Sequence, residues 1–274
     1  MYNSLVCIKE FVTRSCTVEP LLGICTGVEL HKDFYDAIKV SATLPFDKIP
    51  NFPAIKNATR SPRFVMGRIG KLPVMVMDGL LPLSKPEDVV NVITPIRIMC
   101  MLGVKSIIFA NVCDSLSQDL SSGDIVLIRN FVSQFIPTTI TSRSLEEIGV
   151  DFSDIGGMSS KILREELATV AENLSIDLKI GDYVQVTDQR LNGKEIKELK
   201  SLLCDVVGYG LVPESIAAAQ MKVQLAGLTA VVGELGESDL LPESESISYG
   251  ASIHRLGKIL IGYCRFLNAK EYKI

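Results

Sequence analysis

Apolar runs bounded by glycine, proline and serine recur along the chain, and most of them are continuously apolar instead of alternating with polar positions. Continuous runs of this length are typical of strands that are covered on both faces of a sheet. Strands are therefore expected at residues 20–25, 63–69, 72–78, 105–111, 124–132, 180–186, 205–210 and 228–235.

Helical periodicity fills several intervals between these runs. Ser84 and Glu87 have the spacing of a capping box ahead of an apolar stripe, and Gly103 stands where a helix commonly ends. A second helix is expected to begin at Ser159 or Ser160 and to run through Asn173.

The remaining helices follow the same reasoning. The third is expected to begin at Asn192, with Glu195 as its capping partner, and to run through Leu203. The fourth covers residues 213–225, and the last covers about 245–267. That last helix is expected to be broken or strained near Gly250, Gly257 and Gly262.

Strands that alternate with helices indicate an α/β layered fold. Residues 31–62 and 133–157 have the polar, proline-bearing or glycine-bearing composition of long loops, which usually act as lids, interfaces or mobile segments. The chain contains no internal repeat, low-complexity tract or linker. A single domain is therefore expected over residues 1–274, with its core at about 20–267.

The composition indicates where the apolar residues are buried and which classes of partner are excluded. Of 274 residues, 47% are hydrophobic and 22% are charged, and the mean hydropathy is +0.29. No stretch reaches the roughly 18 to 20 consecutive apolar residues of a membrane span, so the excess apolarity is expected in a doubly covered sheet, in a subunit interface or in both.

A net charge of -4 without a basic cluster argues against nucleic-acid binding. Lys9 and Glu10 interrupt any secretion signal, so a cytoplasmic location is expected, with a nuclear one left open.

Metal-binding and disulfide patterns are not found. Seven cysteines are scattered without a Cys-x-x-Cys pair, which indicates reduced, mostly buried thiols. The two histidines, His31 and His254, are too few for a histidine-rich centre. We therefore expect no metal and no cofactor.

Three motifs carry a resemblance to a known family. Residues 95–104 read PIRIMCMLGV, residues 121–131 read SSGDIVLIRNF, and residues 207–214 read VGYGLVPE. With the order of the segments around them, these motifs resemble the trimeric purine nucleoside phosphorylase and methylthioadenosine phosphorylase family over roughly residues 20–267. The resemblance implies a nucleoside phosphorylase-like fold, in which a mixed, largely parallel and partly barrel-like sheet is flanked by helices. It also implies a homo-oligomer, specifically a trimer, and a place in purine metabolism.

The resemblance also implies where phosphate would bind. The family uses a Gly/Ser-rich first loop, an Arg-x-His turn and backbone amides that follow an Asn at a strand end. In the first loop, Thr26 matches the hydroxyl donor, but Glu29 replaces a glycine. In the turn, Leu80 and Pro82 take the places of the arginine and the histidine. Neither side chain can donate a hydrogen bond to phosphate.

The strand-end segment is changed as well. Asn111 is kept, but bulkier side chains and Asp114 replace the small residues that follow it in the family. Side chains there block the close backbone approach that glycines allow. A carboxylate held about 4 Å from an anion would cost about 4 kcal/mol at an effective dielectric constant near 20. Arg60 or Arg63 could still reach in from the preceding loop as a substitute cation.

The purine-binding positions differ from those of the family. The base-reading glutamate falls on Asn192, which the helix pattern also assigns as an N-cap. The ribose-facing methionine falls on Tyr209, and the last purine-reading residue falls on Ser238, or on Asp239 if the register is one residue off. Two roles stay open for Asp239: the acid that protonates the leaving base, or a residue of a solvated acidic loop.

These changes favour a catalytically inactive member of the family, a pseudoenzyme that keeps the fold as a structural or protein-interaction subunit. Its remnant nucleoside and phosphate site would contain Thr26, Asn111, Tyr209 and Asn192, with Asn111 and Asp239 as remnants of the catalytic residues. One alternative is an active purine nucleoside phosphorylase or nucleoside hydrolase that cleaves N-glycosidic bonds with an altered site. A further alternative is a sensor that holds a small neutral molecule there.

Overall fold

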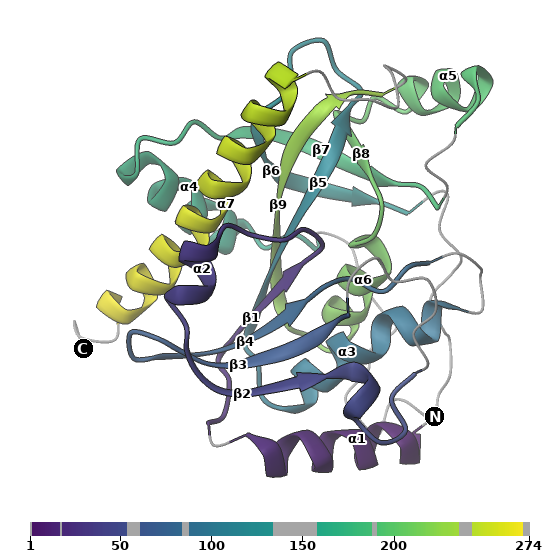
Figure 1. Ribbon diagram of the computed structural model, residues 1–274. Coiled ribbons are helices and arrows are strands. Elements are labelled where there is room, and N and C mark those ends of the chain that lie inside the picture. Colours follow the sequence, from purple (N-terminus) through teal and green to yellow (C-terminus); the bar gives the residue numbers. More distant parts are fainter. Residues whose placement is uncertain are drawn as a thin grey trace.

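The computed structural model describes residues 2–16, 18–53, 61–83, 88–133, 158–187, 191–235 and 243–270. In these ranges one nine-stranded sheet is flanked by helices (Figure 1). The strands are β1 (Leu22–Thr26), β2 (Lys39–Pro45), β3 (Arg63–Ile69), β4 (Leu72–Asp78), β5 (Ser106–Ser115), β6 (Ile125–Val132), β7 (Lys179–Gln185), β8 (Val206–Gly208) and β9 (Gln224–Glu234). The helices are α1 (Tyr2–Ser15), α2 (Lys32–Asp36), α3 (Val89–Met101), α4 (Lys161–Asn173), α5 (Gly193–Ser201), α6 (Val212–Gln220) and α7 (Glu243–Lys270), with a 3-10 turn η1 (Phe46–Lys48). None of the helices in these ranges combines the length and the apolarity needed to cross a membrane.

The sheet mixes parallel and antiparallel pairs and closes on itself at one end. Its strand order is β2-β3-β4-β1-β5-β8-β7-β6-β9, and β9 also pairs with β5. This additional pairing closes β5, β8, β7, β6 and β9 into a small barrel, while β1, β4, β3 and β2 extend from β5 as an open sheet. β1 is parallel to both β4 and β5, whereas β3 is antiparallel to both of its neighbours. The predicted mixed, partly barrel-like sheet flanked by helices is confirmed.

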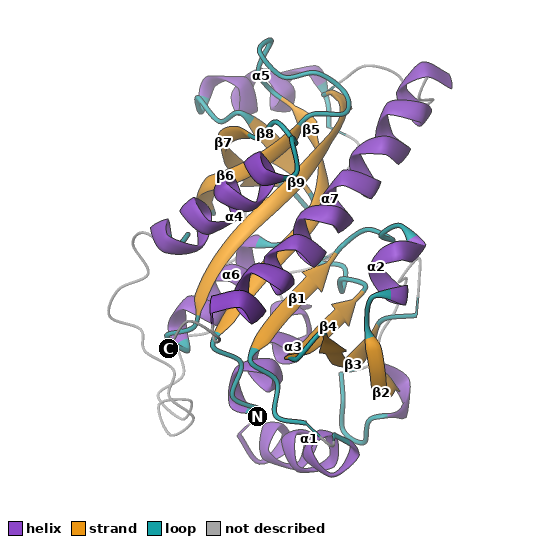
Figure 2. Cartoon of the chain, turned by 90° about the vertical axis from the view of Figure 1, so that its left-hand side faces the viewer, coloured by secondary structure: helices purple, strands orange, loops and turns teal. Residues whose placement is uncertain are grey.

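Two apolar layers cover the two faces of the sheet. Along β5, Ile107 and Phe109 join the layer that contains α1, α3 and α6, while Ile108 and Ala110 join the layer that contains α2, α4 and α7. All four side chains are fully buried, which is the burial on both faces that continuous apolar runs indicate. Figure 2 shows α7 crossing the sheet on the side of α2 and α4.

All the expected strands are present, but the loop predicted over residues 31–62 was wrong, because this region contains α2, β2 and η1. Apolarity does not reveal β2, since it is an edge strand whose residues are mostly exposed. α1 was not predicted either, although Leu5, Ile8 and Val12 repeat at helical spacing and are buried. The other predicted loop lies outside the described residues from position 134 to position 157.

The helix ends follow most of their predicted capping signals. Gly103 has a φ of +99° just after α3, and the hydroxyl of Ser160 accepts a backbone N–H in the first turn of α4. Asn192 and Glu195 form a complete capping box on α5. The capping box predicted over residues 84–87 lies outside the described residues.

Two predictions about helices were wrong. α6 ends at Gln220 and not near residue 225, because β9 has already begun there. α7 is one continuous helix of 28 residues, without a break at its glycines. A Cβ built on Gly257 would lie 3.6 Å from Phe34 Cβ, and one built on Gly262 would lie 2.9 Å from Val170 Cγ1. Gly262 therefore permits close packing against α4, whereas the distance at Gly257 is an ordinary van der Waals contact and nothing lies within 4 Å of a Cβ built on Gly250.

Candidate functional site at the strand ends

The ends of the central parallel strands meet at one edge of the sheet. In the sheet register, Thr26 at the end of β1 lies beside Asp78 at the end of β4 and beside Ala110 in β5. The N–H of Gly27 continues this alignment by donating to the carbonyl of Ala110 at 2.9 Å. Asn111 therefore lies next to the end of β1, at the edge where α/β folds place their ligands. We call Thr26, Asp78, Leu80, Asn111 and Tyr209 the strand-end cluster.

Asp78 is the charged centre of the strand-end cluster. Its side chain is only 2% exposed, and Nε and Nη2 of Arg63 donate to its Oδ2 at 2.9 and 2.8 Å. The hydroxyl of Tyr35 donates to Oδ1 at 2.9 Å, and Thr26 Oγ1 lies 3.5 Å from the same oxygen. Arg63 thus reaches the strand ends, which is what the sequence analysis left open when it considered Arg63 as a substitute cation. Because its guanidinium is bound to Asp78, however, the pair carries no net charge.

Leu80 packs between two backbone turns that are far apart in the chain. A Cβ built on Gly27 would lie 2.7 Å from Leu80 Cδ1, and one built on Gly210 would lie 2.9 Å from the same methyl group. Leu81 and Leu83, which follow in the chain, are buried in the core. The turn in which the resemblance implies an arginine and a histidine is therefore an apolar segment.

Asn111 connects β5 to the turn after β8. Its Nδ2 donates to the backbone carbonyl of Tyr209 at 3.1 Å, and a Cβ built on Gly27 would lie 2.3 Å from its Oδ1. Thr26, Asn111 and Tyr209 are thus brought together at the strand ends. The predicted end of the strand at residue 111 was wrong, because β5 continues through Ser115, where β8 and β9 both pair with it.

Asp114 lies in this extension of β5 and not in a turn. It pairs with Val207 of β8 and Gly233 of β9, and burial raises the pKa of its carboxyl group. Asp114 lies three steps along the extended strand from Asn111, which corresponds to about 10 Å. Repulsion at about 4 Å would therefore apply to an anion beside β8, and not to one beside Asn111.

Buried polar groups hold the turn after β8. The hydroxyl of Tyr183 donates to the carbonyl of Gly210 at 2.9 Å, and burial raises the pKa of this phenol. Leu211 enters α6 with a φ of +83°, a region that residues with side chains rarely adopt. Glu214 in the first turn of α6 is fully buried, and burial raises its pKa to about 7. Strained and desolvated residues of this kind often gather at functional sites.

The thiols around this site are not activated. All seven cysteines are free, as predicted. Burial raises the pKa of Cys25 well above its ordinary value and raises those of Cys100 and Cys113 to about 12. A nucleophilic cysteine needs a lowered pKa, so these side chains do not support cysteine catalysis.

Asn192 serves as a helix cap, and Asp239 lies outside the described residues together with Ser238. Asn192 Oδ1 accepts the N–H groups of Lys194 and Glu195 at 3.0 and 3.1 Å. The side chain is exposed, and these capping bonds already occupy its oxygen. The structure therefore gives Asn192 a local role and no contact with the strand-end cluster among the described residues.

Sequence reasoning missed Asp78 and Tyr35 as site residues. Asp78 ends an apolar strand directly before a glycine, a position where parallel sheets place ligand-binding groups. That signal could have found it. Tyr35 lies in a region predicted as loop, and no local pattern links it to Asp78.

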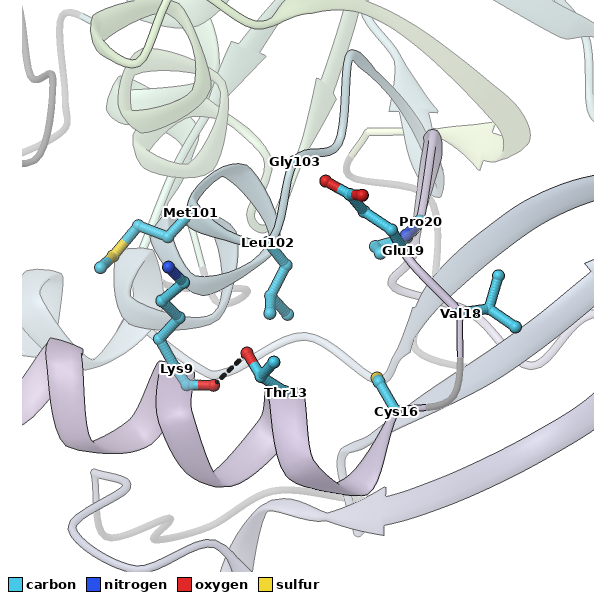
Figure 3. A pocket seen from close by; sticks show the side chains of 9 residues that line it. All are labelled: Lys9, Thr13, Cys16, Val18, Glu19, Pro20, Met101, Leu102 and Gly103. Atoms are coloured by element: carbon cyan, nitrogen blue, oxygen red, sulfur yellow. Dashed lines mark hydrogen bonds between the residues drawn. The ribbon is translucent and has the colours of Figure 1, made fainter.

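A separate pocket of about 370 Å³ lies between α1 and the C-terminal end of α3 (Figure 3). Lys9 faces it from α1, and Glu19 faces it from the segment before β1. It is lined by Lys9, Thr13, Cys16, Val18, Glu19, Pro20, Met101, Leu102 and Gly103. No member of the strand-end cluster is among these residues, so the pocket is distinct from the candidate site.

Comparison with known sequences gives a consistent family match. A family model described as the phosphorylase superfamily matches residues 22–260. Purine nucleoside phosphorylase 1 of Geobacillus stearothermophilus is 25% identical over 223 residues, which is 81% of each chain. The purine nucleoside phosphorylase of Mycobacterium leprae is 28% identical over 225 residues, which is 80% of this chain and 79% of that relative.

Solved structures match over nearly the whole chain. A crystal structure of schistosoma purine nucleoside phosphorylase in complex with hypoxanthine has a TM-score of 0.80 at 26% identity and covers 94% of this chain and 96% of that one. The Schistosoma mansoni purine nucleoside phosphorylase in complex with inosine has a TM-score of 0.81 at 25% identity, with 94% and 95% covered.

Proposed function

Since the matched residues 22–260 make up most of its length, the chain belongs to the phosphorylase superfamily, and we propose that it is a member without nucleoside phosphorylase activity that serves as a structural or protein-interaction subunit. Its similarity to purine nucleoside phosphorylases extends over 80% to 81% of the chain. The observation that carries the proposal is the packing of Leu80 against Gly27 and Gly210. By the family resemblance, this is the position of the phosphate-binding arginine.

The loss of donors argues against phosphorolysis. A guanidinium offers five N–H donors, whereas leucine and proline side chains offer none. Removing one donor that stabilises developing charge typically lowers the rate about 100-fold to 1,000-fold. Leu80 and Pro82 remove two such groups at once, and although such losses do not simply multiply, their combined effect supports an inactive site.

Arg63 does not restore the missing charge. To bring its full charge to phosphate, its guanidinium would have to release Asp78, which is 2% exposed, since in the ion pair only the N–H groups that do not face Asp78 can donate to an anion. Removing one partner from a buried ion pair costs about 3 to 5 kcal/mol when both groups are buried, and somewhat less here because Arg63 is 45% exposed. The neutral Arg63–Asp78 pair is therefore a poor attractor for a dianion.

The remaining polar groups are also occupied. Asn111 donates its amide to Tyr209, and Thr26 faces Asp78. A ligand that binds at the strand ends would have to replace both contacts and lie beside the methyl group of Leu80. This arrangement supports a site closed by its own side chains.

The proposed role as a subunit rests on the resemblance and on composition. Mean hydropathy is +0.29, and Ile180 and Leu203 are 62% and 88% exposed. We propose that the chain forms a homotrimer and that this homotrimer can bind a further protein. Light scattering of the purified chain at micromolar concentration tests it: a mass near three times 29.9 kDa is expected, and a monomer would contradict the trimer.

An activity assay tests the absence of catalysis. The purified chain is incubated with inosine, guanosine, adenosine and methylthioadenosine, with and without phosphate, beside the Geobacillus stearothermophilus enzyme as a positive control. We expect no release of free base. Release that requires phosphate would show a phosphorylase, and release without phosphate would show a hydrolase; either result overturns the proposal.

A binding assay separates an inactive subunit from a sensor. A ligand that binds only the folded chain at 100 times its Kd adds about 2.7 kcal/mol of stability. We expect no thermal shift with phosphate or with any of the four nucleosides. A shift without turnover would favour the sensor alternative.

The double substitution Leu80→Arg with Pro82→His tests which residues closed the site. It returns the two donors that the resemblance implies, so we expect a phosphate-dependent thermal shift that the wild-type chain lacks. Leu80→Met with Pro82→Ala is the matched control and should show none. A folded double variant that shows no thermal shift with phosphate would mean that other residues exclude the anion.

A further inference from the structure

A second group of polar side chains lies at the opposite end of α2 from the strand-end cluster. His31 is the N-cap of α2, Asp33 lies in its first turn, and His254 lies on α7. We call these three residues the histidine cluster; they bring both histidines of the chain together with a carboxylate. Figure 1 and Figure 2 show α2 beside α7, in agreement with the packing of the two helices.

The histidine cluster has the spacing of a metal site. His31 Nδ1 lies 3.2 Å and His254 Nε2 lies 3.1 Å from Asp33 Oδ2. The same Nδ1 accepts the backbone N–H of Asp33 at 3.4 Å, a capping bond that a metal on this nitrogen would replace. One possible ligand atom from each residue lies within 4.8 Å of the other two. Zinc binds nitrogen and carboxylate oxygen at about 2.0 to 2.2 Å, which places neighbouring ligands of a tetrahedral site about 3.3 Å apart. Both histidine–aspartate distances already match that separation.

The backbone around these side chains holds them in place. Phe34, next to Asp33, is fully buried against α7, and a Cβ built on Gly257 would lie 3.6 Å from its Cβ. The two imidazole rings have their centroids 4.3 Å apart. Exposed contacts between histidine and aspartate contribute little stability by themselves. Ligands carried by well-packed elements are the arrangement that a binding site needs.

We propose that His31, Asp33 and His254 bind one late first-row divalent cation, with zinc as the reference ion. Two imidazoles and one carboxylate suit zinc, and imidazole also suits copper and nickel. Three protein ligands leave a fourth position for water. The side chains are 41%, 49% and 34% exposed for His31, Asp33 and His254, respectively, so the cation reaches the site from solvent.

The bound cation would fasten α2 to α7. α2 also carries Tyr35, whose hydroxyl donates to Asp78 in the strand-end cluster. The metal would thus stabilise the folded chain and fix the helix that supports the strand ends. This inference does not depend on whether the chain is an enzyme.

Metal titration of the full-length chain tests the site, after any histidine tag is removed and the protein is treated with a chelator. Cobalt chloride should bind with one equivalent per chain and give visible absorption bands, and zinc chloride should displace it. His31→Asn removes the imidazole but keeps a good N-cap, and His254→Gln keeps a donor toward Asp33. Each should lower zinc affinity about tenfold or more.

The control is Lys258→Gln, an exposed change one helical turn from His254 on α7. It should leave zinc affinity unchanged. Thermal unfolding without metal verifies that each variant is folded before its affinity is compared. The proposal is overturned if the wild-type chain shows no stoichiometric cobalt or zinc binding, or if binding is unchanged in both histidine variants.

Discussion

The two ends of α2 present polar groups in opposite ways. At the C-terminal end, Tyr35 donates to Asp78, a carboxylate that is 2% exposed and already bound to Arg63. At the N-terminal end, His31 and Asp33 are 41% and 49% exposed. The first end is closed within the protein, and the second is open to solvent.

Burial accounts for this difference. A buried polar group is costly unless a protein partner satisfies it, so the groups around Asp78 bind one another and leave little for a ligand. The exposed groups of the histidine cluster also contact one another, but water competes for these contacts, so that a cation can replace them at little cost. The polar groups at the edge of the sheet where a ligand was expected are thus paired with one another, whereas the ligand atoms of the histidine cluster lie at a position that no motif marks.

Phe34→Ala should have the largest effect, because it loosens both ends of α2 at once. The side chain is fully buried against α7. Removing a buried phenylalanine costs about 3 to 5 kcal/mol of stability, measured by urea unfolding. Zinc affinity at the histidine cluster should fall in the same variant.

Tyr35→Phe is the matched control for that change. It removes only the hydroxyl that donates to Asp78, and one hydrogen bond contributes about 1 kcal/mol. Zinc affinity should stay at the wild-type value. A loss below about 1 kcal/mol for Phe34→Ala would mean that α2 does not depend on this contact.

Glu214→Gln tests whether the carboxyl group of Glu214, in the first turn of α6 next to the strand-end cluster, is desolvated. Burial raises the pKa of Glu214 from 4.5 to about 7, so between these values the folded chain keeps a proton that the unfolded chain has lost. Stability of the wild-type chain should therefore fall as pH rises from 4.5 to 7, by about 3 kcal/mol in total. The glutamine variant should lack this decline when urea unfolding is measured at several pH values.

Glu172→Gln, at an exposed position of α4, should keep the pH profile of the wild-type chain. If Glu214→Gln declines as steeply as the wild type between pH 4.5 and 7, then another group causes the pH dependence. The Glu214 carboxyl group would then not be desolvated in solution.

Much of the fold could be predicted, because burial leaves a mark in the sequence. The runs at 105–111 and 228–235 are continuously apolar, and they lie in β5 and β9 at the centre of the sheet. β2 leaves no such mark, since as an edge strand it is mostly exposed. Gly262 of α7 was misleading because glycine weakens a helix and also permits close packing, and local sequence does not separate the two effects.

The candidate site was predictable only where a residue kept its place along the chain. Thr26 and Asn111 meet because neighbouring parallel strands align them, as expected from the strand pattern. The contact of Tyr35 with Asp78 and that of His31 with His254 join segments far apart in the sequence. Such contacts depend on how helices pack, which periodicity along one segment does not encode.

Arg63→Met should leave the carboxylate of Asp78 buried without its cation. We expect a loss of about 2 to 3 kcal/mol, below the 3 to 5 kcal/mol of a fully buried pair, because the side chain of Arg63 is 45% exposed. Adding Asp78→Asn should recover part of this loss, since the remaining amide carries no charge. Urea unfolding of the two single variants and the double variant gives the coupling energy, and additive losses would contradict the ion pair.

His254→Gln should have the smallest effect on stability when metal is absent. Exposed ion pairs contribute about 0 to 1 kcal/mol, and His254 is 34% exposed, so metal-free wild type and variant should unfold within about 1 kcal/mol of each other. With zinc present, both chains should gain stability as the zinc concentration rises, and the gain of the variant should be smaller by about 1.4 kcal/mol or more at high zinc, as a tenfold lower affinity implies. A loss of about 2 kcal/mol or more without metal would show that the histidine cluster is a structural contact like the one at Asp78. The histidine cluster is thus expected to add stability only when a cation is bound. The difference between the unfolding free energies measured with and without zinc therefore distinguishes it from the Asp78 contacts, which stabilise the chain without a ligand.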